Sequence, residues 1–170
     1  MDDVVTYTAR NVAVHRGVQH VIGTVDLTLT TDRLIATTCG TGLLDRPRTI
    51  DVALVDLVRF ALVPANRAQQ MLGEATYDAE LLLSYRLDGD VRRRRILVDS
   101  TDPALRQLLA RLAALRPEAS LLDVEPAEAY GEIGAADPTR TVKILLAVVV
   151  GVPVLISLVM IILAATGNAG

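Results

Sequence analysis

The chain has 170 residues, enough for one domain of ordinary size and an additional segment. Its formal net charge is −3, and it contains one Phe and no Trp. This composition argues against a nucleic-acid-binding protein, which would use a basic surface with interleaved aromatic side chains. The single Cys39 excludes an intramolecular disulfide, in agreement with a reducing compartment.

The first clear strand signal lies in residues 23–38. Val25, Leu27 and Leu29 alternate with polar residues, and the alternation resumes after a turn near Asp32. Period-two alternation is typical of strands with one buried face, so we predict a hairpin here. The residues before it begin with an acidic stretch and contain no apolar core segment, so we expect no secretory signal.

Two further pairs of strands follow along the chain. Residues 48–63 predict two strands separated by a short break near Asp56. The segments AELLLSYRL (79–87) and VRRRRILV (91–98) flank Asp88-Gly89. Asp-Gly favours the backbone conformations of a two-residue hairpin turn, so these segments predict a second hairpin.

A helix is predicted over residues 103–115. Asp102 is a suitable N-cap, Pro103 suits the first helical position, and Arg116-Pro117 ends the helix. One apolar stripe recurs at helical spacing, formed by Leu105, Leu108, Leu109, Leu112 and Leu115. We expect this helix to close the open end of a small β-barrel and to bury the stripe.

The remaining residues predict a linker and a membrane anchor. Residues 117–140 contain three prolines, two glycines and six acidic residues, which favours a flexible linker. Residues 141–166 are predicted to be a transmembrane helix, followed by a short tail at 167–170. The uncharged run 144–165 would be about 33 Å long as a helix and matches a hydrocarbon core of about 30 Å.

The flanks of the predicted span indicate its orientation. Arg140 and Lys143 precede the uncharged run 144–165, and no charged residue follows it. The positive-inside rule therefore predicts a single-pass protein of the cell membrane, tail-anchored, with residues 1–143 in the cytoplasm. Ala147 and Gly151 form a small-xxx-small pair that would permit homo- or hetero-oligomers through the span, although such pairs also occur by chance.

The order of about seven strands followed by one helix, over residues 1–116, resembles the PH-like superfold, and most closely its GRAM and bacterial PH-like branches. The segments that carry the resemblance are GTVDLTLTTDRLI (23–35) and TIDVALVDLVRFAL (49–62). The resemblance implies a mainly β, seven-strand barrel or roll closed by one C-terminal amphipathic helix. The chain departs from the family pattern because it has no Trp in this helix and no basic phosphoinositide motif between the first two strands.

The candidate binding residues are arginines of the second hairpin, namely Arg86, Arg92, Arg93, Arg94 and Arg95. Alternation along a strand places Arg92 and Arg94 on one face and the other two arginines of the run on the opposite face. The resemblance implies that this hairpin lies at a ligand-binding end and meets anionic lipid headgroups. The alternative is a solvated charge run that protects a strand edge, since Asp88 and Asp90 at the turn reduce the attraction to anions.

Signals for catalysis are weak. His15 and His20 have no third metal ligand at suitable spacing, and the segment around Cys39 is typical of a loop with a small buried thiol. No phosphate-binding loop or hydrolase motif is present. We therefore expect a protein that is not an enzyme and has no catalytic residue, metal or cofactor.

The resulting hypothesis is a tail-anchored membrane protein. It would present a PH-like binding module to the cytoplasm, for a protein partner or for anionic lipid headgroups. The first alternative is a non-catalytic structural subunit of a larger membrane protein assembly. The second alternative is an enzyme of unknown class.

Overall fold

The computed structural model describes residues 4–16, 19–42, 46–65 and 77–135. All of these belong to the first of the two compact units of the chain, residues 1–135. The predicted span 141–166, the basic residues Arg140 and Lys143, the Ala147/Gly151 pair and the tail 167–170 all lie outside the described residues. Within the described ranges, no helix has the length and apolar composition needed to cross a membrane.

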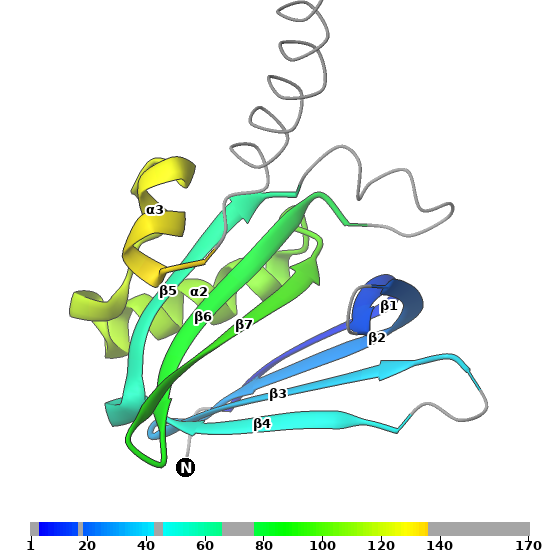
Figure 1. Ribbon diagram of the computed structural model, residues 1–170, viewed down its shortest axis with the longest axis horizontal. Helices are drawn as coiled ribbons and strands as arrows, with labels where there is room; N and C mark the ends of the chain where they lie inside the picture. Colours follow the sequence, from blue (N-terminus) through cyan, green and yellow to red (C-terminus); the bar gives the residue numbers. More distant parts are fainter. Residues whose placement is uncertain (1–3, 17–18, 43–45, 66–76, 136–170) are drawn as a thin grey trace, which may run out of the picture. The chain divides into compact units, whose positions relative to one another are not determined.

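The described residues form seven strands in two antiparallel sheets (Figure 1). The first sheet has the strand order β1-β2-β3-β4 and the second has the order β5-β6-β7, so within each sheet consecutive strands pair. The bounds are β1 Val5–Arg16, β2 Gln19–Leu29, β3 Arg33–Gly40, β4 Arg48–Ala53, β5 Leu57–Pro64, β6 Ala79–Leu87 and β7 Asp90–Val98. The predicted mainly β fold is confirmed.

The sequence predicts a barrel or a roll, and of these the closed barrel is wrong. The short 3-10 turn η1, Leu54–Asp56, joins β4 to β5 at the predicted break and passes the chain from one sheet to the other. A closed barrel needs hydrogen bonds between its first and last strands. In the described part of the chain no strand of one sheet pairs with a strand of the other, so the edge strands are β1 and β4 in the first sheet and β5 and β7 in the second.

The core lies between the two sheets. The first sheet contributes Tyr7, Leu27 and Leu34 to this core, and the second sheet contributes Phe60 and Leu83. The Asp88-Gly89 turn is confirmed, because both residues have positive φ, 54° and 86°, as a two-residue hairpin turn requires. Local turn chemistry therefore sets the register of β6 against β7.

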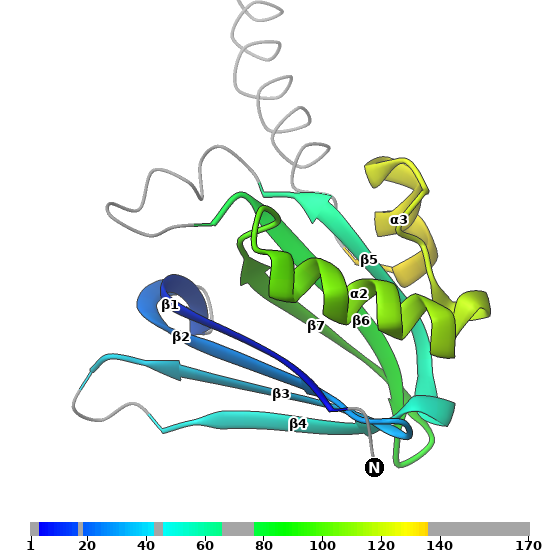
Figure 2. The ribbon, with the colours of Figure 1, turned by 180° about the vertical axis from the view of Figure 1, so that it is seen from behind.

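The predicted helix is α2, Pro103–Leu115 (Figure 2). The Asp102 carboxylate accepts a hydrogen bond from the Ala104 backbone N–H at 2.7 Å, which confirms the N-cap. α2 contacts β1 and adds its leucines to the core between the sheets. The leucines that are buried there are Leu105, Leu108, Leu109 and Leu112.

Residues 117–135 are ordered, so the prediction of a flexible linker over 117–140 is wrong for this part. The chain forms the 3-10 turn η2, Pro117–Ala119, and the Leu121 N–H then donates to the Phe60 carbonyl at 2.9 Å. A second helix follows, α3, Pro126–Ile133. The compact domain therefore extends beyond the predicted boundary at residue 116 and ends at Ala135.

Packing explains the order of α3. Its buried residues Ala129, Tyr130 and Ile133 cover Ala61, Val63 and Leu82 on the outer face of the second sheet. β6 is buried on both faces from Ala79 to Tyr85, and its outer face places Leu82 between Glu80 and Ser84, so α3 covers one apolar and two polar side chains there. A helix of eight residues is too short to be stable in isolation, and its sequence alone therefore gives little signal.

Gly23 on β2 offers a sharp test of the close packing in the first sheet. A Cβ atom at this position would overlap the Cys39 carbonyl oxygen of β3 and lie 2.7 Å from Cγ2 of Val14. We expect Gly23→Ala to lower the free energy of unfolding by at least about 1–3 kcal/mol, measured by urea denaturation. Gly131→Ala is the matched control, because nothing lies within 4 Å of its Cβ, and it should be neutral or slightly stabilising in α3. Equal effects of the two substitutions would contradict this packing.

Candidate binding site between the two sheets

Two of the arginines on β7, Arg93 and Arg95, form hydrogen bonds within the domain. Arg95 donates from Nε and Nη2 to Oε2 of Glu80, at 3.2 Å and 2.6 Å. The Tyr130 hydroxyl of α3 donates to the same oxygen at 3.1 Å, and the Arg95 guanidinium lies 5.7 Å from the centre of the Tyr130 ring. The buried Glu80 carboxylate of β6 thus binds one side chain of β7 and one side chain of α3.

Arg93 also holds α3. Its Nε donates to the Ile133 carbonyl at 2.7 Å, at the C-terminal end of the helix where carbonyls lack helical partners. Gly134 ends α3 with a φ of 68°, and a Cβ there would lie 2.7 Å from Nη2 of Arg93. Arg93 and Arg95 therefore fasten α3 to the second sheet, a role that the sequence alone does not predict.

The other candidate arginines have different surroundings. Arg86 is exposed on β6, and Arg92 is exposed and lies 3.4 Å from the Asp90 carboxylate. Surface pairs of this kind contribute little to stability. Arg94 lies on the inner face of β7 with Arg92 and Ile96, and it lines a cavity between the two sheets.

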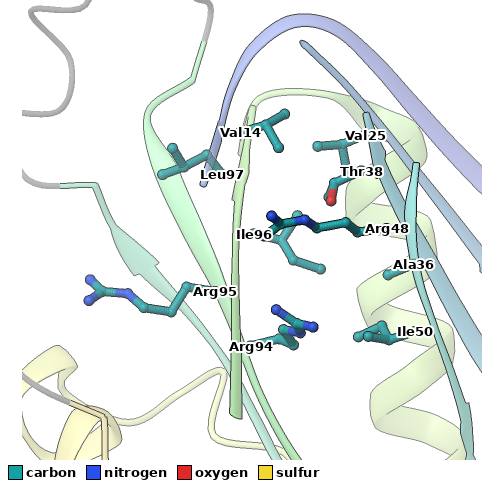
Figure 3. A pocket seen from close by; sticks show the side chains of 10 residues that line it. All are labelled: Val14, Val25, Ala36, Thr38, Arg48, Ile50, Arg94, Arg95, Ile96 and Leu97. Carbon is teal, nitrogen blue, oxygen red and sulfur yellow. The ribbon is translucent and has the colours of Figure 1, made fainter. Parts of the chain in front are cut away.

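This cavity is about 40 Å³ and lies between the first sheet and β7 (Figure 3). Arg48 of β4 and Arg94 of β7 extend toward it from opposite sides, over side chains that are mostly aliphatic. In the part of the chain that the structure describes, neither arginine forms an ion pair. The lining residues are Val14, Val25, Ala36, Thr38, Arg48, Ile50, Arg94, Arg95, Ile96 and Leu97.

The arrangement suits an anion with an apolar neighbour. Guanidinium groups present planar sets of donors that match the oxygens of carboxylates and phosphates. An arginine that has no acidic partner retains this capacity for a ligand. The sequence did not single out Arg48, because only the tertiary structure brings β4 opposite β7.

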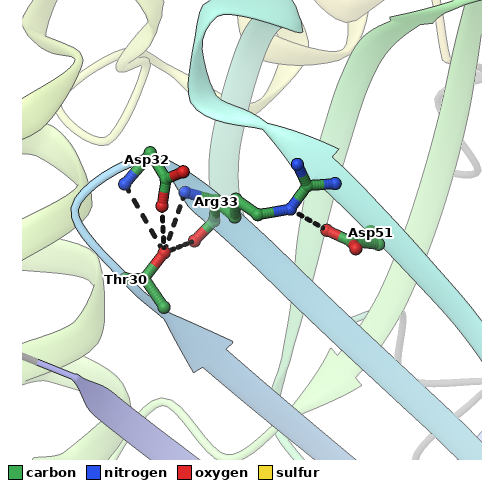
Figure 4. A network of polar contacts seen from close by, with 4 residues as sticks. All are labelled: Thr30, Asp32, Arg33 and Asp51. Atoms are coloured by element: carbon green, nitrogen blue, oxygen red, sulfur yellow. Dashed lines mark hydrogen bonds and ion pairs between the residues drawn. The ribbon is translucent and has the colours of Figure 1, made fainter.

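The polar cluster at the β2–β3 turn has a structural role (Figure 4). The Thr30 hydroxyl donates to Asp32 at 2.8 Å and accepts from the Arg33 backbone N–H at 3.0 Å. Arg33 Nε donates to Asp51 of β4 at 2.7 Å, and this hydrogen bond raises the pKa of the guanidinium. The cluster fixes the turn and the β3–β4 register, with its polar groups bonded to one another.

The residues considered for catalysis lie on β1, β2 and β3. The backbone of His15 pairs with that of His20 across β1 and β2. Cys39 lies on β3 opposite Thr24, half-buried, rather than in the predicted loop. No group of three or more potential metal-ligating residues occurs among the described residues.

The comparisons with known proteins assign no family to this chain. No family model and no curated protein matches the chain. Among solved structures, the chain is similar to the hSac2 domain from the human phosphoinositide phosphatase Sac2, with 12% sequence identity and a TM-score of 0.45. That similarity covers 69% of this chain and 73% of the other. The strand pairing and the cavity themselves define a mainly β, two-sheet domain with an arginine-flanked cavity between its sheets.

Proposed function

We propose that the chain is a non-catalytic, tail-anchored binding module. Its PH-like domain faces the cytoplasm, and the helix over residues 141–166 spans the cell membrane once. The domain binds an anionic group, carried by a protein partner or by a lipid headgroup. The observation that supports this proposal is the convergence of Arg48 and Arg94, without acidic partners in the described chain, at an apolar cavity between the sheets.

The anchor lowers the affinity that the site needs. A domain that is recruited from solution must supply all of the binding energy itself. A tethered domain meets membrane-bound ligands at an effective concentration in the mM range, so two arginine contacts and a small apolar contact suffice. The remaining exposed arginines at the hairpin add little, because Asp90 lies 3.4 Å from Arg92 and Asp88 adds a second negative charge in the turn between their strands.

The test is purification of the full-length chain from membranes in mild detergent, with identification of the bound proteins and lipids. We expect the chain to stay in the membrane fraction after carbonate extraction. We also expect at least one anionic lipid or protein to be enriched about tenfold over the Arg48→Gln/Arg94→Gln double variant.

Arg86→Gln is the matched control for the lost charge, because Arg86 is exposed on β6 away from the cavity lining. This control should retain the bound ligand. The proposal fails if the same proteins and lipids accompany the wild type and the double variant in equal amounts, or if carbonate releases the chain.

A further inference from the structure

The cavity between the sheets has an apolar floor and a charged rim (Figure 3). Arg48 and Arg94 are exposed and form the rim. The floor consists of aliphatic side chains that are each at most 7% exposed, namely Val14, Val25, Ala36 and Ile96. A ligand that fills this site therefore enters with an apolar group and leaves its anionic group at the rim.

The volume of the cavity limits the apolar group that enters. At about 40 Å³ the cavity equals roughly three waters, at about 10–15 Å³ each. Apolar cavities that accept a benzene molecule are about 150 Å³, so an aromatic ring is too large for this one. The floor therefore accepts one small aliphatic side chain and excludes an aromatic side chain or a lipid acyl chain.

The ligand must also carry its anionic group close to its apolar group, because the floor and the rim belong to one small cavity. The C-terminal residue of a protein meets this requirement, since its carboxylate and its side chain share one Cα atom. In an extended internal segment, neighbouring side chains point to opposite faces, and the next one on the same face lies about 7 Å further along. In a phospholipid, the glycerol group separates the phosphate from the acyl chains.

We propose that the cavity binds the C-terminus of a protein partner whose last residue is small and aliphatic. The last side chain enters the floor, and the terminal carboxylate lies between the guanidinium groups of Arg48 and Arg94. Both arginines bind it through charge-assisted hydrogen bonds, and the preceding residues leave the cavity past the rim. This inference rests on the proposed binding of an anionic group and names the source of that group.

The experiment uses the full-length chain in nanodiscs of neutral lipid and two synthetic libraries of random eight-residue peptides. One library has a free C-terminal carboxylate, and the other has the same peptides with an amidated C-terminus. Bound peptides are identified by mass spectrometry. We expect enrichment from the free-acid library alone, with Val, Ala or Ile as the last residue and no aromatic residue there.

An enriched peptide is then titrated into the methyl-labelled protein in the same nanodiscs. We expect the methyl signals of Ile50 and Ile96 to shift, because both side chains line the cavity. Amidation of the peptide should weaken binding at least tenfold, and so should Arg48→Gln or Arg94→Gln. Arg92→Gln is the matched control, on the same strand as Arg94 but outside the cavity lining, and should change binding less than twofold.

Ala36→Val tests the floor separately from the rim. The substitution adds two methyl groups to a residue of the floor and leaves both arginines in place. We expect it to abolish peptide binding while an arginine-dependent anionic ligand is still retained. Urea denaturation checks that the variant is folded, and if it is not, the comparison of acid and amide peptides on the wild type decides.

Three results would overturn the inference. The first is the absence of any enriched free-acid peptide, and the second is equal binding of the acid and amide forms. The third is enrichment of peptides that share an internal acidic residue and have no aliphatic last residue. In each case, an arginine-dependent protein or lipid in the membrane purification leaves the proposed binding of an anionic group intact, whereas its absence removes both proposals.

Discussion

Replacing Arg95 by Met is expected to lower the free energy of unfolding by about 3 kcal/mol. The Glu80 side chain is 0% exposed, and the substitution removes the charge that compensates its carboxylate. Oε1 of Glu80 already lacks a hydrogen-bond partner among the described residues. Without Arg95, the Tyr130 hydroxyl would be the one side-chain donor to the carboxylate that the described structure shows. The Arg95 side chain remains 28% exposed, which places the expected loss at the lower end for a broken buried pair.

Urea denaturation of a fragment of residues 1–135, followed by circular dichroism, measures this loss. Arg92→Met is the matched control on the opposite face of β7 and should change the stability by no more than about 0.5 kcal/mol. The Glu80→Met/Arg95→Met double variant should recover most of the loss, because two apolar side chains leave no buried charge. A double variant that is less stable than Arg95→Met would show that the carboxylate stabilises α3 in another way.

The second large effect is expected for α2. Leu108→Ala should lower the free energy of unfolding by about 2–5 kcal/mol, because Leu108 is 0% exposed in the core between the sheets. Truncation there removes apolar contacts and leaves a cavity that the two sheets and the helix cannot fully close. The same urea denaturation measures the change.

Leu87→Ala provides the control for the same chemical truncation. Leu87 is 48% exposed near the β6–β7 turn, so its loss should cost no more than about 0.5 kcal/mol. A Leu108 variant with the stability of the wild type would mean that α2 is not docked on the sheets. The comparison thus tests burial of the helix and not merely leucine content.

The cluster of Glu80, Arg95 and Tyr130 changes the meaning of the four consecutive arginines on β7. As a sequence, VRRRRILV suggests one continuous basic surface. In the structure, two of the four hold α3, one lies beside Asp90, and one lines the cavity opposite Arg48. A protein that offers a single arginine of this run to a ligand differs in specificity from one that offers four.

Several features of the domain followed from local sequence alone. The Asp88-Gly89 turn, the Asp102 cap with Pro103 and the alternation of Val25, Leu27 and Leu29 were each predicted and are each present. Such signals act within a few residues, because turn φ angles, capping hydrogen bonds and strand periodicity depend on immediate neighbours. The anchor at 141–166 has an equally local signal and stays a prediction.

Only the tertiary structure decided the rest. The sheets do not close into a barrel because, in the described chain, β4 does not pair with β5 and β1 does not pair with β7, and no local pattern records whether distant edges meet. α3 forms because Ala129, Tyr130 and Ile133 cover a sheet that lies far away in the sequence. The cavity arises in the same way, since packing of the sheets brings Arg48 opposite Arg94. Long-range contacts depend on how whole elements bury their apolar faces, and that information is spread over the chain rather than held in any one segment.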